Sequence, residues 1–406
     1  MSTVNDRERE DAASPDAPPL DDAQSVSRTR GRRLSRRPKL YTSYRQDMAL
    51  LNTPSKRNAV LALLAFAAVS PWLFADSLLF IFAVAFAAAI GAIGLNLVTG
   101  FAGQVSLGHA FFIAVGAYTA AAFTGDPDVR HIGLGMQWVV AVPAAALTAG
   151  LAGLVISPLA VRLRGLYLAI VTLGLVFLGE HIWKEWRSLT GGLGAGRRGV
   201  IVEVAGARLD RAGELFGIFM TAQQKMFYVT LILLVALAIL ARNLTRSAIG
   251  RAWSAIRDRD IAAEIMGIPL TKYKAMAFGI SSAYAGVAGA LLYSVTRVID
   301  PGSFNLLMSI QYIAMILVGG VATISGAIAG ALFISFLPFI TRQAPVLFPF
   351  IATDPALRGG GLINVFQLEG ILYGVLIIAF LVLQPRGLFG LWIKIRNYWK
   401  GWPFSY

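Results

Sequence analysis

Long apolar runs separated by short polar segments dominate the chain from residue 59 to residue 384. Seven of these runs come close to the roughly 20 apolar residues that an α-helix needs to cross a hydrocarbon layer of about 30 Å. They cover residues 59–75, 78–98, 137–161, 165–182, 226–241, 274–296 and 364–384. The pattern predicts an all-α fold and a polytopic membrane protein.

Two further segments complete the predicted set of spans. Residues 109–124 form a shorter apolar run, and residues 305–342 are too long for one crossing and carry glycines and a serine in the middle. Splitting the second segment gives about ten transmembrane helices. An even number agrees with the basic residues at both ends of the chain, because lysine and arginine near the spans favour the cytoplasmic side.

Composition changes sharply at both ends of this apolar region. Residues 1–57 combine an acidic, proline-containing stretch with the basic sequence RTRGRRLSRRPK, and they hold too little apolar surface to build a core. We predict a disordered, basic cytoplasmic tail there, either solvated or touching anionic lipid. Residues 58–392 form the predicted transmembrane domain, with a cytoplasmic loop at 244–272, and residues 393–406 form a cytoplasmic C-terminal tail.

The net charge of +14 follows from basic residues that flank the apolar runs rather than from one amphipathic face. Such a distribution reports membrane orientation and argues against nucleic-acid binding. The chain has no cysteine, which excludes disulfides and thiolate metal sites. We predict no metal site.

Glycine and uncharged polar residues interrupt two of the apolar segments. GLNLVTGFAGQVSLGHAFF begins at Gly94, and VGGVATISGAIAG begins at Val318. Their corresponding places in the two halves of the chain predict broken spans related by an inverted repeat, whose unwound backbone lines a cavity. Close helix packing through small residues is the alternative, and it is the expected role of GISSAYAGVAGALL from Gly279.

Neutral polar side chains of the two interrupted segments are the candidates for a translocation path. They are Asn96, Thr99, Gln104, Ser106, His109 and Ser325. Such dipoles suit a zwitterion or an amide, and His109 is expected to cap or pack rather than to bind. The other ionisable side chains lie near the span ends, which disfavours a carrier driven by protons.

The sequence shows no catalytic constellation: neither a pair of carboxylates, nor a metal-ligand cluster, nor a nucleophile with a base is visible. The stretch GGLGAGRRG at 191–199 lacks the lysine and the serine or threonine of a phosphate-binding loop. We therefore predict that the chain is not an enzyme, and that the energy for transport comes from outside it.

The cytoplasmic loop contains a short helix with clear end signals. In RDRDIAAEIMGIPLTKYK, Asp260 is expected to cap the helix, Gly267 to end it and Pro269 to prevent its continuation. Upstream, apolar residues recur at helical spacing: Ile249, Ala252, Trp253 and Ile256. Such an element either docks a partner or lies on the lipid surface.

A series of motifs between about residue 91 and residue 390 resembles the permease subunit of bacterial branched-chain amino-acid ABC importers. The motifs are GLNLVTGFAGQVSLGHAFFIAVGAY, RLRGLYLAIVTLG, LTGG, GRAWSAIRDRDIAAEIMGIPLTKYKAMAF, AGVAGAL, MILVGGVATISGAIAGA and QPRGLFG. The resemblance implies a type II ABC importer fold in the bacterial cytoplasmic (inner) membrane. It also implies a translocation path for branched-chain amino acids or a similar small polar solute.

The same resemblance implies partners. These are a second homologous permease, two ATPase subunits, an extracytoplasmic substrate-binding protein and membrane lipid. No cofactor is expected on this chain, because ATP and Mg²⁺ would bind the ATPase subunits. The coupling residues that the family pattern implies are Asp260, Ala262, Ala263, Glu264, Gly267 and Ile268. The alternative function is a stand-alone channel or facilitator for a small neutral solute such as urea, which has no use for a docking helix.

Overall fold

The computed structural model describes residues 54–401 except 127–130, 164, 195, 200, 205, 216, 344, 346–350 and 353–362. Most of the predicted N-terminal tail therefore lies outside the described residues. The chain divides into two units, Met1–Ala62 and Leu63–Tyr406. Of the first unit, residues 54–62 are described, and they are helical.

The described residues are predominantly helical, as the apolar runs predict. The helices are α3 (Pro54–Leu73), α4 (Asp76–Leu95), η2 (Asn96–Phe101), α5 (His109–Thr124), α6 (Trp138–Arg162), α7 (Leu166–Glu185), α8 (Arg187–Thr190), α9 (Ala222–Arg246), α10 (Ala248–Asp258), α11 (Asp260–Ile265), α12 (Leu270–Thr296), η3 (Pro301–Ser303), α13 (Leu306–Gly319), α14 (Ile324–Thr341), α16 (Val365–Leu383) and α17 (Gly387–Gly401).

Short strands in the loops are a feature that the apolar pattern does not predict. They form three antiparallel pairs and one parallel pair, the last between β7 and β8. The strands are β1 (Arg197–Arg198) with β6 (Val298–Ile299), β2 (Glu203–Val204) with β3 (Ala207–Arg208), β4 (Gly213–Leu215) with β5 (Ile218–Met220), and β7 (Ile351–Ala352) with β8 (Ile363–Asn364).

Six helices within the described ranges are long and apolar enough to cross a membrane, and a seventh is added if the pair α16–α17, bent by 43°, is one span. The six are Asp76–Phe101, Trp138–Arg162, Leu166–Glu185, Ala222–Arg246, Leu270–Thr296 and Ile324–Thr341. Shorter apolar helices occupy Val60–Leu73, His109–Thr124 and Leu306–Gly319. The polytopic helical architecture is confirmed, whereas the count of ten spans stays a prediction.

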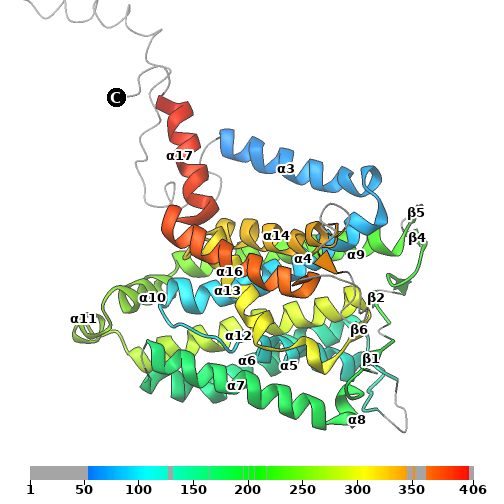
Figure 1. Cartoon of the computed structure of the whole chain (residues 1–406), viewed down its shortest axis with the longest axis horizontal. Coiled ribbons are helices and arrows are strands. Elements are labelled where there is room, and N and C mark those ends of the chain that lie inside the picture. The colour runs from blue at the N-terminus through cyan, green and yellow to red at the C-terminus, as the bar shows by residue number, and fades with distance from the viewer. Residues whose placement is uncertain are drawn as a thin grey trace, which may run out of the picture. The chain divides into compact units, whose positions relative to one another are not determined.

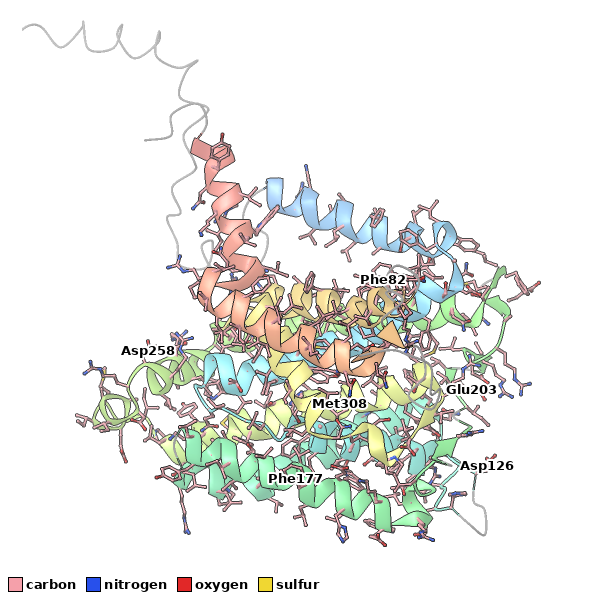
Figure 2. The ribbon with its side chains drawn as sticks, viewed as in Figure 1. Phe82, Asp126, Phe177, Glu203, Asp258 and Met308 are labelled. Atoms are coloured by element: carbon pink, nitrogen blue, oxygen red, sulfur yellow. The ribbon has the colours of Figure 1, made fainter. Side chains whose placement is uncertain are left out.

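Helices α4 and α12 form the centre of the second unit. In each of them 72% of the most apolar stretch is buried inside the protein, compared with 33% in α6 and 22% in α9. Helix α12 packs against α4, α5 and α6, and α4 packs in addition against α9 and α14. The peripheral helices therefore leave apolar faces for lipid, such as the one that carries Phe177 on α7 (Figure 2).

Small residues on α12 allow its neighbours to approach closely, as the sequence GISSAYAGVAGALL predicts. A Cβ at Gly289 would overlap the carbonyl oxygen of Ile113 in α5, and a Cβ at Gly116 would overlap the backbone of Gly286. A Cβ at Gly286 itself would overlap the Ala145 carbonyl of α6. These glycines set the distance between three helices.

The connections gather at two opposite ends of the second unit (Figure 1). We call them the α10 end, with the described residues among 96–104, 163–165, 247–270, 319–323 and 384–387, and the strand end, with the described residues among 125–137, 186–221 and 297–305. Figure 2 shows Asp258 at the first end and Asp126 and Glu203 at the second.

Hydrogen bonds tie each group of loops together. At the α10 end, Arg257 Nη1 donates to Gly100 O (3.0 Å). At the strand end, β1 pairs with β6, and the Gly194 N–H donates to Asp300 Oδ1 (2.8 Å). Each end is thus built from segments far apart in the sequence.

The inverted relation expected between the two broken segments is wrong for this pair. Helices α4 and α13 both run from the strand end to the α10 end, and α5 and α14 both return from it (Figure 1). Both breaks therefore lie at the α10 end, where Asn96 contacts Ala322 and Thr323. In an inverted repeat, the two helices that precede the breaks would run in opposite directions.

The glycine contacts of α12 predict the effect of a single methyl group. Gly289→Ala is expected to lower the thermal unfolding midpoint of the purified protein in detergent, because overpacking costs about 1–3 kcal/mol and here the obstacle is backbone. Gly174→Ala on α7 is the matched control: no atom lies within 4 Å of the added methyl, and alanine is the better helix former by roughly 1 kcal/mol. Equal midpoints for both variants would contradict this account of the α5–α12 contact.

Candidate translocation and coupling site

The chain leaves the α-helical conformation at the end of α4. Six residues form the π-helical turn η2, after which the Ala102 N–H donates to Leu97 O (3.1 Å) and the Gln104 N–H donates to Val98 O (2.9 Å). Gly103 has a φ of 71°, a value that glycine adopts without strain. Residues 102–108 are then without helical structure until α5 begins at His109, so the predicted break is present.

Helix α5 begins beside the middle of α4, not at the α10 end. Gly91, which contacts His109, lies about ten residues before the end of η2, or roughly 15 Å along a helix. Polar groups here are hydrogen-bonded to other helices: His109 Nε2 to Gly91 O (2.9 Å), the Ala110 N–H to Ser309 Oγ (3.1 Å) and the Leu107 N–H to Thr172 Oγ1 (2.9 Å). Such partners are required wherever backbone is unwound at membrane depth.

Asn96 connects the two breaks. Its Nδ2 donates to Thr323 O (2.9 Å), and its Oδ1 accepts from the Ala322 N–H (2.9 Å). Ala322 adopts a φ of 59°, which is unusual for a residue with a Cβ. Gly100 lies directly beneath this contact, because a Cβ there would overlap Asn96 Oδ1. The asparagine amide thus holds η2 against the turn between α13 and α14.

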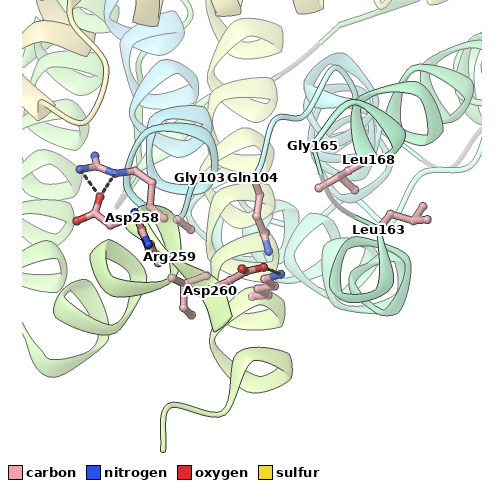
Figure 3. A pocket seen from close by; sticks show the side chains of 12 residues that line it. Gly103, Gln104, Leu163, Gly165, Leu168, Asp258, Arg259 and Asp260 are labelled. Atoms are coloured by element: carbon pink, nitrogen blue, oxygen red, sulfur yellow. Dashed lines mark hydrogen bonds and ion pairs between the residues drawn. The ribbon is translucent and has the colours of Figure 1, made fainter. Parts of the chain in front are cut away.

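Gln104 is the predicted path residue that faces open space. Its side chain is 5% exposed, and neither Nε2 nor Oε1 has a hydrogen-bond partner within the described part of the chain. Figure 3 shows it pointing into a cavity of about 200 Å³ between the break and the coupling segment. An unpaired buried amide carries a desolvation cost that a solute or water in the cavity would remove.

The other predicted path residues occupy structural positions. Thr99 Oγ1 donates to Gln104 O (3.1 Å), and Ser106 Oγ accepts from the Gly108 N–H (3.3 Å). His109 is buried at the first turn of α5 and packs against the Tyr312 ring at 5.0 Å between centroids. Ser325 is exposed on the first turn of α14 and does not line the cavity. The structure therefore groups five of these residues at one break and separates Ser325 from them.

Lys274 is a site residue that sequence reasoning assigns only to a span end. The fold buries it to 5% exposure and places its Nζ 3.9 Å from Asp260 Oδ2 at the cavity wall. Arg257 is a second such residue, since its side chain crosses from α10 to the carbonyl of Gly100. Lys274 lies just past the predicted loop 244–272 and Arg257 lies within it, so the basic residues of this loop and its flank are the signal available in the sequence.

The short helix α11 ends as its sequence predicts. Gly267 has a φ of 82°, its N–H donates to Glu264 O (2.9 Å), and the Ile268 N–H donates to Ala263 O (3.0 Å). These two bonds form a Schellman motif. The predicted capping role of Asp260 is wrong: Arg259 occupies the N-cap position, and Asp260 is the first helical residue, whose Oδ1 accepts from the Ile261 N–H (2.9 Å).

Helix α10 anchors this segment to the bundle. Its apolar face is buried against protein rather than lipid, and Trp253 Nε1 donates to Tyr273 O (2.9 Å). Helix α11 behaves differently: Ala263 is 2% exposed, whereas Ile261, Ile265 and Met266 are 62%, 83% and 82% exposed. Ala263 is therefore a packing residue, and the accessible apolar face consists of side chains that the family pattern does not single out. Ile261 and Ile265 are four residues apart, and this helical spacing is the signal in the sequence for an apolar face on α11.

Buried polar groups brace the strand end. Arg197 donates from Nη1 to Leu189 O (3.0 Å) and from Nη2 to Ile132 O, and burial lowers the pKa of its guanidinium although Tyr293 acts in the opposite direction. Burial also tends to raise the pKa of Asp210, but the hydrogen bond and charge of Arg208 outweigh it, so that the pKa lies below its usual value. The arginines near LTGG are thus partly structural.

A bundle of apolar helices with a break at one end, and with an exposed short helix beside that break, is consistent with a polytopic membrane permease. Residues 77–382 match the family described as "Branched-chain amino acid transport system / permease component". The chain belongs to this family, whose members are permease components of transport systems rather than enzymes. The expected resemblance is confirmed.

Individual relatives agree with this assignment. The chain is 33% identical over 243 residues to the high-affinity branched-chain amino acid transport system permease protein LivM of Salmonella typhimurium, covering 57% of this chain and 56% of LivM. It is 32% identical to LivM of Escherichia coli K12, covering 59% and 58%. LivH of Salmonella typhimurium is 27% identical over 60% of this chain and 78% of LivH. The matched region thus spans a little more than half of the LivM proteins, and no solved structure matches the chain.

The contacts of Asn96 predict a test of the connection between the breaks. Asn96→Leu removes both hydrogen bonds. The Thr323 carbonyl still accepts from the Ala327 N–H, whereas the part-buried Ala322 N–H loses the partner that Asn96 provides, at about 1–3 kcal/mol. We expect a lower thermal unfolding midpoint and faster proteolysis at residues 320–323. Thr99→Val on the same turn removes only the hydrogen bond from Thr99 to the Gln104 carbonyl. This variant should change the unfolding midpoint and the proteolysis rate much less. An unaltered midpoint for Asn96→Leu would show that the breaks are held together by packing alone.

Proposed function

We propose that the chain is the transmembrane permease subunit of an ATP-driven importer for branched-chain amino acids or a similar small polar solute. The observation that carries the proposal is helix α11, which is anchored through Ala263 and exposes Ile261, Ile265 and Met266 beside the broken span. The family match over residues 77–382 supports the solute class. An exposed apolar face on so short a helix suits a partner that buries it.

The proposed partners follow from the same observations. Similarity to both LivM and LivH supports pairing with a second, homologous permease. Two ATPase subunits would dock at the α10 end and bind ATP and Mg²⁺, and an extracytoplasmic binding protein would deliver the solute at the strand end. Asp260, Ala262, Glu264, Gly267 and Ile268 are the proposed coupling residues beside the three exposed apolar ones.

The proposed path passes the break at residues 96–109. Gln104 supports this most directly, because its amide has no hydrogen-bond partner among the described residues and faces a cavity. Asn96, Thr99, Ser106 and His109 would shape the break through their hydrogen bonds rather than contact the solute. No observation favours the alternative of a stand-alone channel for urea, which would leave the apolar face of α11 without a use.

The proposed location is the bacterial inner membrane, with both termini and the α10 end in the cytoplasm. The chain has no cysteine, so single cysteines report sidedness. Ala248→Cys at the α10 end and Glu214→Cys at the strand end both replace exposed residues. A membrane-impermeant maleimide is expected to label Glu214→Cys in intact cells and Ala248→Cys only after permeabilisation. Labelling of Ala248→Cys in intact cells would reverse the proposed orientation.

The proposed ATPase contact is tested by a charge on the apolar face of α11. Ile265→Asp should reduce co-purification of the ATPase subunits and solute-stimulated ATP hydrolysis at least about tenfold, because burying such a side chain contributes about 1.5–3 kcal/mol. The permease itself should remain folded, since Ile265 is 83% exposed. Ile218→Asp, which replaces an exposed residue at the strand end, is the matched control and should leave co-purification of the ATPase subunits unchanged.

A backbone variant separates the position of α11 from its surface. Gly267→Val forces a β-branched residue into the left-handed region, which costs on the order of 1–2 kcal/mol, and should displace α11 without altering its exposed side chains. Co-purification should fall as for Ile265→Asp. Full ATPase binding and coupled hydrolysis in both variants would exclude α11 as the ATPase contact and with it the proposed importer mechanism.

A further inference from the structure

Helix α17 leaves the bundle at the α10 end. It begins at Gly387, shortly after α16 ends, and the two helices meet at a bend of 43°. Figure 1 shows α17 (red) running across the direction of α7 rather than along it. Its first turn is enclosed by protein, since Gly387 and Gly390 are buried, whereas residues 391, 392 and 394–398 are exposed. Most of α17 therefore lies outside the packed bundle.

The start of α17 is fixed against the turn between α13 and α14. Gly387 has a φ of 62°, and a Cβ there would lie 2.6 Å from Gly320 N and from Val318 O. A Cβ at Gly320 would in turn lie 2.8 Å from Arg386 O. This is the turn that Asn96 contacts. The direction of α17 is thus set by backbone contacts with the second break.

An apolar stripe follows one side of α17. Its members recur at intervals of three and four residues, the spacing of one face of a helix. The stripe begins at Leu388, which packs against the hydrophobic core. Its further members are exposed: Leu391 to 40%, Trp392 to 60%, Ile395 to 51% and Tyr398 to 62%. Tryptophan and tyrosine are enriched where a membrane meets water, because their rings are apolar and their tips polar.

The charge of this segment has one sign. No aspartate or glutamate follows Glu369 in the sequence, whereas four basic residues do: Arg386, Lys394, Arg396 and Lys400. Lys394 and Arg396 directly precede and follow Ile395, so they lie on the two sides of the stripe. Neither forms an ion pair within the described part of the chain, and Lys394 Nζ donates to Gln384 Oε1 (2.9 Å).

This combination of stripe and charge fits one environment better than two others. If α17 continued the span of α16, Lys394 and Arg396 would enter the hydrocarbon layer, which is costly. If α17 lay wholly in water, four large apolar side chains in a row would be solvated. At the surface of a bilayer, the stripe contacts acyl chains while the flanking basic side chains reach the headgroups.

We propose that α17 lies on the bilayer surface at the α10 end and binds anionic phospholipid. Trp392 and Ile395 contact the acyl chains, and Lys394 and Arg396 contact headgroup phosphates. Anionic lipid is favoured over zwitterionic lipid because the segment carries positive charge alone. The inference goes beyond the proposed transport function and holds whichever solute is carried.

The experiment uses the purified full-length chain in phosphatidylcholine vesicles that contain phosphatidylglycerol. Ile395→Cys carries a bimane fluorophore, since the parent chain has no cysteine. Lipids brominated in their acyl chains quench a fluorophore that they contact. At equal mole fraction, brominated phosphatidylglycerol should quench at least about twofold more than brominated phosphatidylcholine, because basic residues attract anionic lipid. Asn397→Cys, an exposed position on the opposite face, is the matched control and should be quenched by aqueous iodide instead.

Charge variants separate the lipid preference from the position of α17. Lys394→Gln with Arg396→Gln, both at exposed positions, should make the two brominated lipids equally effective. Arg251→Gln with Lys272→Gln removes the same charge from exposed positions at the same end and should leave the preference unchanged. Equal quenching by both lipids in the parent, or an unchanged preference in the first pair, would overturn the proposed lipid binding.

Iodide identifies what else could cover or surround the stripe. Iodide quenching of Ile395→Cys as strong as that of Asn397→Cys would show that α17 lies in water. Protection of Ile395→Cys from iodide and from both brominated lipids would show that protein covers the stripe. Either result would overturn the proposal, whereas protection from iodide together with quenching by brominated phosphatidylglycerol would support it.

Discussion

Unwound backbone inside a membrane must find hydrogen-bond partners within the protein, and this constraint organises the centre of the permease. The chain breaks after α4 and starts α5 only beside Gly91, so the polar groups of residues 96–109 meet side chains and carbonyls of α4, α7 and α13. Asn96 adds the turn between α13 and α14 to the same network. The positions of α4, α7, α13 and α14 thus depend on hydrogen bonds to the polar groups of one interrupted segment.

Close approach of the central helices makes that network reachable. Gly116, Gly286 and Gly289 bring α5 and α6 against α12 at distances that no side chain would permit. With larger residues there, the helices would separate and the hydrogen bonds across the break would lengthen beyond their useful range. The small residues of α12 and the polar residues of the break therefore serve one arrangement: the glycines of α12 allow close helix packing, and residues 102–108 form the break.

Local signals carried most of what the sequence could predict. The break, the left-handed Gly267 and the buried face of α10 each depend on residues close together in the chain, where periodicity and backbone sterics decide. Relations between distant segments could not be predicted in this way. The shared direction of the two breaks, the contact of Asn96 with Ala322, the burial of Lys274 and the short strands all arise from which segments meet at an end of the bundle. Composition does not determine which segments meet there.

The α10 end combines a fixed element with an accessible one. Trp253 and the apolar face of α10 are buried against the bundle, whereas α11 and its C-cap present Ile265 and Met266 outward. Arg257, at the end of α10, contacts the carbonyl of Gly100 in the break. A displacement of α11 therefore has a short physical route to the break: through the first residues of α11 to Arg257, and from Arg257 to Gly100 and Gly103. A partner that binds α11 acts directly next to the segment whose hydrogen bonds hold the broken span in place.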